Sequence, residues 1–312
     1  MKTFAKILKH SISDVDNSEV VTYELTYPRM VHAELMTHRL FSRNAASSRA
    51  IPINKLIDLI KEDCANPVEW GLNRSGMQAK EVHNNPELCM RTWIKAAERA
   101  ILSCEELRDL GLHKQICNRV IEPYQYIKTI VTATEYDNWF WLRDHGDADP
   151  TIKKLAQDMW NVLQLSHPQR LHHFEYHVPY VDTKRCPHTN VLEYWSGDKL
   201  IDVEEAIKIS TSCCAQVSYR VLDDSLEKAL DIYDKLVTMS PVHASPFEHV
   251  CNPMAYPTIV LEGYWDVLDR GEHVDSKGNI WSGNFKGWSQ YRQEIPNNAC
   301  WDLDKFRKDN KE

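Results

Sequence analysis

The alternation of apolar and polar residues along the chain predicts a small number of strands. Val20–Tyr27 alternates as a half-buried strand that ends at Pro28, and Tyr126–Thr132 is rich in the β-branched residues that strands favour. Thr258–Trp265 is a third candidate strand. We expect these strands to form a sheet that is mostly antiparallel and flanked by helices, which places the chain in the α+β fold class.

Apolar residues that recur every three to four positions predict the helices. We expect helices from Arg29 to about Phe41, over Pro86–Leu110, His113–Ile121, Ala133–Arg143 and Ser225–Thr238, and from Pro150 to about Leu165. Asp149 and Pro150 are suited to begin a helix, and Asp202 with Glu205 has the spacing of a capping box that starts another. The polar stretch Ser42–Arg49, residues 166–200 and Gly271–Trp288 are expected to be irregular.

Composition narrows the class of protein. The chain has 312 residues, 43% of them hydrophobic and 26% charged, without a repeat or a linker, so we expect one globular domain over residues 1–312. The formal net charge of −8 argues against a nucleic-acid partner. No membrane-spanning run and no signal peptide is recognisable, which predicts a cytoplasmic protein, and the nine scattered cysteines are expected to be free thiols.

Absent motifs limit how a phosphate can be held. The sequence lacks the glycine-rich loops of dinucleotide and triphosphate sites, so a phosphate would depend on arginine side chains. The segment from Thr37 to Arg49 is the best candidate for such a site, because it gathers arginines, serines, a histidine and an asparagine. Glu34 lies four positions before His38 on the same helical face. The alternative is a solvated basic loop after a Glu–His helix pair.

Three further groups of residues carry possible chemistry. His243-Ala244-Ser245-Pro246-Phe247-Glu248-His249 gathers polar groups at a proline turn, where they could hold a heterocycle, a metal or only cap the turn. Arg119 and Arg143 flank an aromatic stretch, although lone arginines often form surface ion pairs. The last group has zinc-ligand chemistry, but its spacing matches no common zinc finger and we assign no metal: His172, His173, His177, Cys186 and His188.

Several of these segments together resemble the flavin-dependent thymidylate synthases (ThyX family). His38-Arg39, seven residues and Ser47, with Asn44 inside and Arg49 after, is similar to the arginine signature of that family. The His243–His249 turn is similar to its His-x-Thr-Pro-Phe-Glu-His turn. Further segments with counterparts in the family are Cys214–Tyr219, Arg119–Pro123 and Asn138–Arg143.

The order of the segments is reversed relative to the family, in which the Ser-Tyr and Pro-Phe-Glu-His segments precede the arginine signature. The resemblance therefore implies a circularly permuted ThyX-like fold, which is tolerated where the termini of a domain lie close together. Residues 1–165 would supply the arginine-signature half and residues 201–265 the Ser-Tyr and Pro-Phe-Glu-His half. Residues 166–200 and 266–312 would be an insertion and an extension.

The resemblance implies an enzyme that reductively methylates dUMP to dTMP with FAD, NADPH and 5,10-methylenetetrahydrofolate, in a homotetramer with shared active sites. It implies Arg143, Ser47 and His38 as catalytic residues. The FAD-binding residues would be His38, Arg39, Asn44, Asn138, Ser218, His243, Ser245 and Glu248, and the dUMP-binding residues Glu34, Ser47, Ser48, Arg49, Arg119 and Arg143. The folate and the nucleotide would be its small-molecule partners.

Three positions depart from the family pattern. Thr37 stands where the signature has Arg, Ala45 where it has Glu, and Glu34 where the family has Gln. An ionised carboxylate accepts hydrogen bonds but cannot donate them, so Glu34 bears on which pyrimidine is bound. The alternatives are a related flavin-dependent methyl- or hydroxymethyltransferase acting on another deoxypyrimidine monophosphate such as dCMP, a flavin- or nucleotide-binding protein without catalysis, and a zinc hydrolase built around Cys186.

Overall fold

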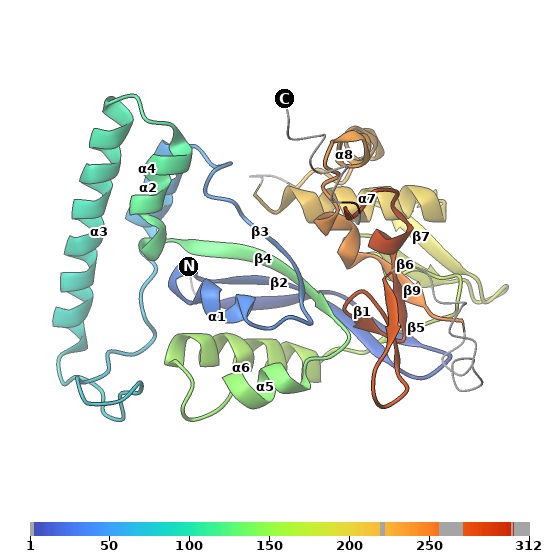
Figure 1. The fold of residues 1–312 in the computed structure, drawn as a ribbon, viewed down its shortest axis with the longest axis horizontal. Helices are drawn as coiled ribbons and strands as arrows, with labels where there is room; N and C mark the ends of the chain where they lie inside the picture. Colours follow the sequence, from blue (N-terminus) through green and yellow to red (C-terminus); the bar gives the residue numbers. More distant parts are fainter. Residues whose placement is uncertain (1–2, 219–221, 256–270, 301, 303–312) are drawn as a thin grey trace.

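A five-stranded sheet forms the centre of the computed structural model, which describes residues 3–218, 222–255, 271–300 and 302 (Figure 1). The strand order is β3-β4-β2-β1-β5, and every pairing is antiparallel except that of β1 with β5. The strands are β1 (Phe4–Ser13), β2 (Glu19–Pro28), β3 (Ser42–Ala45), β4 (Tyr126–Ala133) and β5 (Gln169–Leu171). The predicted α+β class with a mostly antiparallel sheet is confirmed.

One face of the sheet carries the largest apolar core. Side chains alternate between the two faces of a strand, so Tyr23, Leu25 and Tyr27 of β2 all point to the same side. There they pack against α5 (Asp137–Arg143) and α6 (Pro150–Gln164), which lie beneath the sheet in Figure 1. Asp149 caps α6 by accepting hydrogen bonds from the backbone N–H groups of Thr151 and Ile152, as the sequence predicts.

The opposite face is covered by the C-terminal part of the chain. Helices α7 (Val203–Ala215) and α8 (Leu226–Thr238) lie above the sheet in Figure 1. Asp202 and Glu205 form the predicted capping box at the start of α7. The 3₁₀ turns η3 (Gln216–Ser218) and η4 (Ser245–His249) follow these two helices.

A third group of helices stands beside the sheet, at the end where β4 begins (Figure 1). It consists of α2 (Ile53–Glu62), α3 (Pro86–Asp109) and α4 (Lys114–Val120), followed by the turn η2 (Glu122–Tyr124). Leu56 and Ile60 of α2 pack with Ile101 of α3 and Cys117 of α4 in a separate small core. The predicted helices Pro86–Leu110 and His113–Ile121 are confirmed within one or two residues, whereas α2 was not predicted.

Four expectations require correction. The helix from Arg29 shortens to η1 (Arg29–Val31) and α1 (His32–Met36), and the polar stretch after it contains strand β3, which gains its hydrogen bonds from β4. Residues 166–200 contain β5, β6 (Asp182–Arg185), β7 (Leu192–Ser196) and the start of β8 (Lys199–Ile201). Strands of three to five residues are too short to show a clear alternation, which explains why they were missed.

The expected glycine-rich loop also contains short strands. They are β10 (Glu272–Val274), β11 (Ile280–Ser282), β12 (Phe285–Lys286) and the start of β13 (Trp288–Gln290), and β13 pairs with β9 (Cys251–Pro253). The turn η7 (Tyr291–Glu294) follows. The candidate strand Thr258–Trp265 lies outside the described residues. Among the residues that are described, no helix is both long and apolar enough to cross a membrane.

The central core gives a prediction about stability. Leu25→Ala removes a side chain with no exposed surface from the sheet core, so we expect it to lower the free energy of unfolding by about 2–5 kcal/mol. The matched variant Leu102→Ala changes an exposed leucine on α3 and should cost less than about 0.5 kcal/mol. Urea unfolding followed by circular dichroism measures both, and equal losses would contradict the assignment of Leu25 to the core.

Candidate active site

Arg143, at the end of α5, connects the side chains of a polar cluster that we call the Arg143 cluster: Glu34, Thr37, His38 and Arg143. Its Nη1 lies 2.9 Å from Glu34 Oε2, its Nε donates to His38 Nε2 at 3.1 Å, and its Nη2 donates to Thr37 Oγ1 at 3.1 Å. The three partners come from α1 and the turn after it. Since a guanidinium has five N–H groups, these contacts engage three of them.

His38 is the most buried member of the Arg143 cluster. Its ring lies edge-on to Trp139 at a centroid distance of 4.8 Å and stacks on Phe41 at 5.6 Å. Burial and then the positive charges of Arg143 and Arg43 lower the pKa of His38 to about 4. The imidazole is therefore neutral at pH 7, and because Nε2 accepts the hydrogen bond from Arg143, Nδ1 carries the proton.

A large cavity opens beside this cluster. Its volume is about 1240 Å³, and Glu34 and Arg143 both line it. The remaining wall comes from the segment between α2 and α3 and from the start of α6, and it includes Lys80, Lys153 and Lys154. The cavity is larger than the roughly 300–1,000 Å³ of typical ligand sites, so it has room for more than one small molecule. Burial raises the pKa of the Glu34 carboxyl, and Arg143 opposes this shift.

A second polar group, the Glu122 cluster, consists of Arg29, Ser48, Arg119 and Glu122. Glu122 Oε1 accepts a hydrogen bond from Ser48 Oγ at 2.6 Å and lies 3.1 Å from Arg29 Nη2 and 3.2 Å from Arg119 Nη1. Two guanidinium groups thus share one carboxylate. The Ser48 side chain is buried and committed to Glu122, whereas the Arg119 side chain is more than half exposed.

The proline turn His243–His249 lies against the arginine-signature segment of the same chain. Its 3₁₀ turn η4 contacts β3, and His249 Nδ1 is hydrogen-bonded to Thr132 Oγ1 of β4 at 2.8 Å. Nearby, Asn44 Nδ2 donates to the carbonyl oxygen of Cys214 at 3.2 Å, and Asn44 Oδ1 is buried with no partner among the described residues. Glu248 pairs with Arg292. The proline turn and the arginine-signature segment therefore meet within one chain.

A buried chain of hydrogen bonds holds this turn to the sheet, and we call it the Thr22–Thr132 relay. Ser11 Oγ contacts His177 Nδ1 at 2.9 Å, and His177 Nε2 contacts Thr22 Oγ1 at 2.8 Å. Thr22 Oγ1 lies 2.7 Å from Thr132 Oγ1, which in turn contacts His249. Burial lowers the pKa of His249 to about 3 and that of His177 far below its ordinary value, so both rings are neutral.

Comparison with known proteins identifies the family of this chain. Residues 2–169 match the family model Thy1, described as thymidylate synthase complementing protein. The chain belongs to this family. The match contains strands β1 to β4 of the central sheet, the Arg143 cluster and the Glu122 cluster, whereas Cys214–Tyr219 and His243–His249 lie beyond it.

Solved structures similar to this Thy1 family member include two of the UMP/dUMP methylase PolB from Streptomyces cacaoi, bound with 5-Br dUMP and with 5-Br UMP. Each is 15% identical to this chain and covers 53% of it. The matches span 90% and 89% of the methylase chain, with TM-scores of 0.43 and 0.41. A search of curated proteins finds no match.

The predicted site residues of this Thy1 protein fall into separate places. Glu34, His38 and Arg143 come together in the Arg143 cluster, and Ser48 and Arg119 in the Glu122 cluster. Asn44, Ser245 and Glu248 lie at or beside η4, where His243 Nε2 is 3.4 Å from Ser245 Oγ. Ser47 is partly exposed, and Arg39, Arg49 and Asn138 are exposed, outside these clusters. The side chain of Ser218 lies outside the described part.

Sequence reasoning missed four charged residues that organise these clusters: Arg29, Arg43, Glu122 and Arg292. Glu122 stands inside the segment Arg119–Pro123, and a carboxylate three residues after an arginine on a helix was an available signal. Arg43 lies within the arginine signature and donates to the carbonyl oxygens of Met36 and His38 at the end of α1. Nothing local marks Arg292 as the partner of Glu248.

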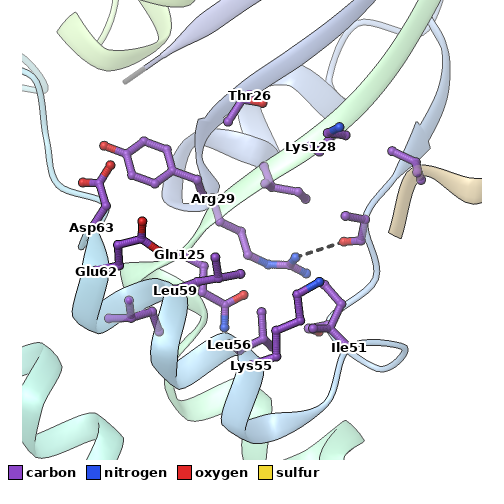
Figure 2. Close-up of a pocket in the computed structure, with 16 residues that line it drawn as sticks. Thr26, Arg29, Ile51, Lys55, Leu56, Leu59, Glu62, Asp63, Gln125 and Lys128 are labelled. Atoms are coloured by element: carbon purple, nitrogen blue, oxygen red, sulfur yellow. Dashed lines mark hydrogen bonds between the residues drawn. The ribbon is translucent and has the colours of Figure 1, made fainter. Parts of the chain in front are cut away.

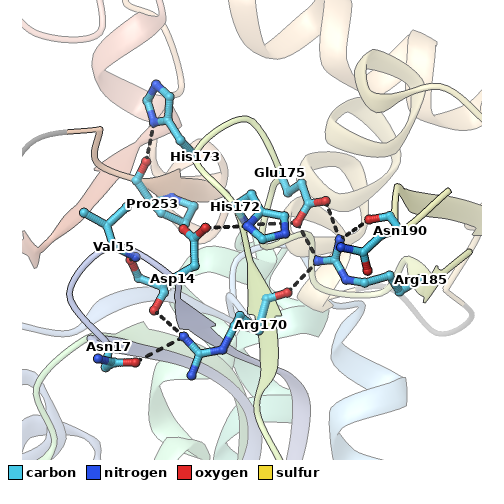
Figure 3. A network of polar contacts seen from close by, with 11 residues as sticks. Asp14, Val15, Asn17, Arg170, His172, His173, Glu175, Arg185, Asn190 and Pro253 are labelled. Carbon is cyan, nitrogen blue, oxygen red and sulfur yellow. Dashed lines mark hydrogen bonds and ion pairs between the residues drawn. The ribbon is translucent and has the colours of Figure 1, made fainter. Parts of the chain in front are cut away.

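The histidine-rich segment from His172 to His188 forms structural contacts (Figure 3). His172 pairs with Asp14, His173 Nδ1 lies 2.8 Å from the carbonyl oxygen of Pro253, and Arg185 pairs with Glu175 at 2.7 Å. His177 belongs to the Thr22–Thr132 relay. Across the described ranges, no three His, Cys, Asp or Glu side chains gather closely enough to hold a metal ion.

The neutral, buried histidines predict a pH-dependent stability. A histidine whose folded pKa lies below its unfolded value of about 6.5 binds protons mainly in the unfolded chain. We therefore expect the free energy of unfolding to be highest above pH 6.5 and to fall as the pH decreases toward 4. His249, with a folded pKa of about 3, should contribute a slope of up to about 1.4 kcal/mol per pH unit.

The variant His249→Asn tests that contribution. It should reduce the slope of unfolding free energy against pH between about pH 6 and 5, whatever its effect on stability at pH 7. His188→Asn changes an exposed histidine and serves as the matched control, with an unchanged slope. Urea titrations at several pH values give the slopes, and identical slopes in both variants would show that His249 is not held neutral.

Proposed function

We propose that this chain is a flavin-dependent methyltransferase that reductively methylates dUMP to dTMP, with 5,10-methylenetetrahydrofolate as carbon donor and NADPH as reductant. The observation that carries the proposal is the Arg143 cluster at the wall of the 1240 Å³ cavity, in a chain that belongs to the Thy1 family. The cluster offers a cation, a carboxylate and a neutral imidazole side by side, which suits a planar, polar heterocycle with an attached phosphate.

FAD is the cofactor that the proposal requires, and the residues around η4 are suited to hold it. Asn44 Oδ1 is a buried acceptor with no partner in the described part of the chain, and Ser245 and Glu248 lie on η4, which packs against β3. Together with His38, Arg39, Asn138, His243 and Ser218, these residues would form the flavin site. When bound, the flavin supplies the electrons and relays the one-carbon unit, so no cysteine nucleophile is needed.

Arg143 and Glu34 are proposed to recognise the pyrimidine ring through hydrogen bonds. Two N–H groups of Arg143 remain for ring carbonyl oxygens after its three contacts within the cluster. Ionised Glu34 accepts from the N3–H group of uracil, whereas N3 of cytosine is itself an acceptor and would be repelled. This favours dUMP over dCMP, the substrate of the alternative enzyme. Ser47, Arg49 and Arg119 are proposed to hold the phosphate, with Ser48 fixing Glu122 beside Arg119.

The exposed positions of Arg39, Arg49 and Asn138 support an active site that a second subunit completes. These side chains lie outside the Arg143 cluster of their own chain, so they are free to face a neighbouring copy in the proposed homotetramer. His38 would remain neutral and orient Arg143 through Nε2 rather than act as a cation.

Turnover with dUMP deuterated at C5, methylenetetrahydrofolate and NADPH tests the proposed function. The purified protein should be yellow, and mass spectrometry should find dTMP that has lost the deuterium. Arg143→Ala should weaken dUMP binding by about 10- to 100-fold, because a charged hydrogen bond contributes roughly 1.5–3 kcal/mol. Arg91→Ala, on the exposed face of α3, should change neither measurement. A colourless protein that stays colourless with added FAD would refute the proposal.

Glu34→Gln tests the reading of the pyrimidine. A glutamine amide can accept from uracil or donate to cytosine, so the ratio of kcat/KM for dCMP to that for dUMP should rise by about 10-fold. Glu98→Gln, an exposed residue of α3, is the matched control and should leave the ratio unchanged. If the ratio is the same in wild type and Glu34→Gln, Glu34 does not face the base.

A further inference from the structure

A second cavity, of about 320 Å³, lies apart from the Arg143 cluster, and no role has been given to it so far (Figure 2). It is bounded by α2, by the first residues of β4 and by Val217 of η3. None of Glu34, His38 and Arg143 lines it. We call it the α2 cavity.

The walls of the α2 cavity are mainly apolar. Leu56, Leu59 and Ile60 project from one face of α2, and Ala46 and Ile51 also line the cavity. Leu56 and Ile60 are buried, but Leu59 keeps 41% of its surface exposed and is the most exposed apolar residue of the wall. A volume near 300 Å³ is at the lower end for small-molecule sites, so the cavity suits a compact molecule of one or two rings.

Polar groups give the cavity a preference for an anion. Arg29, Lys55 and Lys128 line it, against two carboxylates, Glu62 and Asp63 (Figure 2). Lys128 is paired with Glu24 at 3.4 Å, so Arg29 is the cation on which the preference depends. The Arg29 guanidinium lies 3.1 Å from Glu122, a carboxylate that it shares with Arg119. Two arginines on one carboxylate leave a surplus of positive charge beside an apolar wall.

A buried amide adds a specific hydrogen-bonding group. Gln125, which is 5% exposed, lines the cavity beneath Arg29, and its Nε2 has no hydrogen-bond partner among the described residues. A buried donor without a partner is destabilising, and a ligand oxygen would supply the missing acceptor. In Figure 2 the side chain is drawn near Leu56 and Leu59, which line the same cavity.

We propose that the α2 cavity binds an aromatic carboxylate of one or two rings, with its ring against Leu56 and Leu59 and its carboxylate toward Arg29 and Gln125. The apolar wall would pack against the aromatic ring, and the positive charge of Arg29 would attract the carboxylate. The cavity shares Ser48 and Arg29 with the Glu122 cluster, but its test does not depend on the proposed methyltransferase activity, because binding is measured without nucleotide, flavin or folate.

Ligand-observed NMR on the full chain tests the proposal, with 2-naphthoate as the probe. Naphthoate should bind saturably, and the neutral amide 2-naphthamide at least about 10-fold more weakly, because it lacks the charge that Arg29 attracts. Leu59→Trp fills the cavity and should weaken naphthoate binding by about 10-fold or more. Leu102→Trp, an exposed leucine on α3, is the matched control and should bind as wild type does.

A second variant keeps the test valid if Leu59→Trp does not fold. Gln125→Leu removes the amide while preserving its approximate size, and it should weaken naphthoate more than naphthamide. Arg143→Ala should bind naphthoate normally, which separates this site from the proposed nucleotide site. Equal affinities for naphthoate and naphthamide, equal binding in Leu59→Trp and Leu102→Trp, or no saturable binding at millimolar concentrations would each overturn the proposal.

Discussion

The hydrogen bond between Thr22 and Thr132, on neighbouring strands of the central sheet, is the point at which distant parts of the chain are joined. At 2.7 Å and fully buried, it links two polar side chains that an apolar environment would otherwise penalise. Each threonine is also hydrogen-bonded to a histidine: Thr22 to His177, from the segment before β6, and Thr132 to His249, from η4. Since both rings are held neutral, the relay brings no charge into the core.

This relay gives a physical account of how segments far apart in the chain are brought together. A site requires that its groups lie close in space, and their order along the chain matters only through the connections between them. Here β4 holds η4 through His249, β3 lies beside η4, and Asn44 of β3 donates to the carbonyl oxygen of Cys214 at 3.2 Å. The segments before and after residue 200 are therefore assembled on one sheet by buried polar contacts, and the long connection between them contributes His177 to the same relay.

Elements with strong local signals could be predicted from the sequence. Helices α6 and α7 begin at Asp149 and at the Asp202–Glu205 capping box, and β2 ends at Pro28. The strands that were missed, such as β3 and β6, are short and polar, and they exist because a neighbouring strand supplies their hydrogen bonds. Glu34, His38 and Arg143 were each identified as candidates, but no local pattern shows that Arg143 reaches Glu34 across 109 positions of the chain.

The two arginine clusters differ in how much of their charge is available. In the Arg143 cluster one guanidinium faces one carboxylate and a neutral imidazole, so its charge is nearly balanced and its remaining N–H groups can read a ring. In the Glu122 cluster two guanidiniums compete for one carboxylate, and the surplus favours an anion. The Arg119 side chain is more than half exposed, so its positive charge faces solvent, whereas Arg29 lines the α2 cavity. A ligand bound at Arg29 changes the electrostatic potential at Arg119, and the reverse, because both guanidinium groups pair with Glu122.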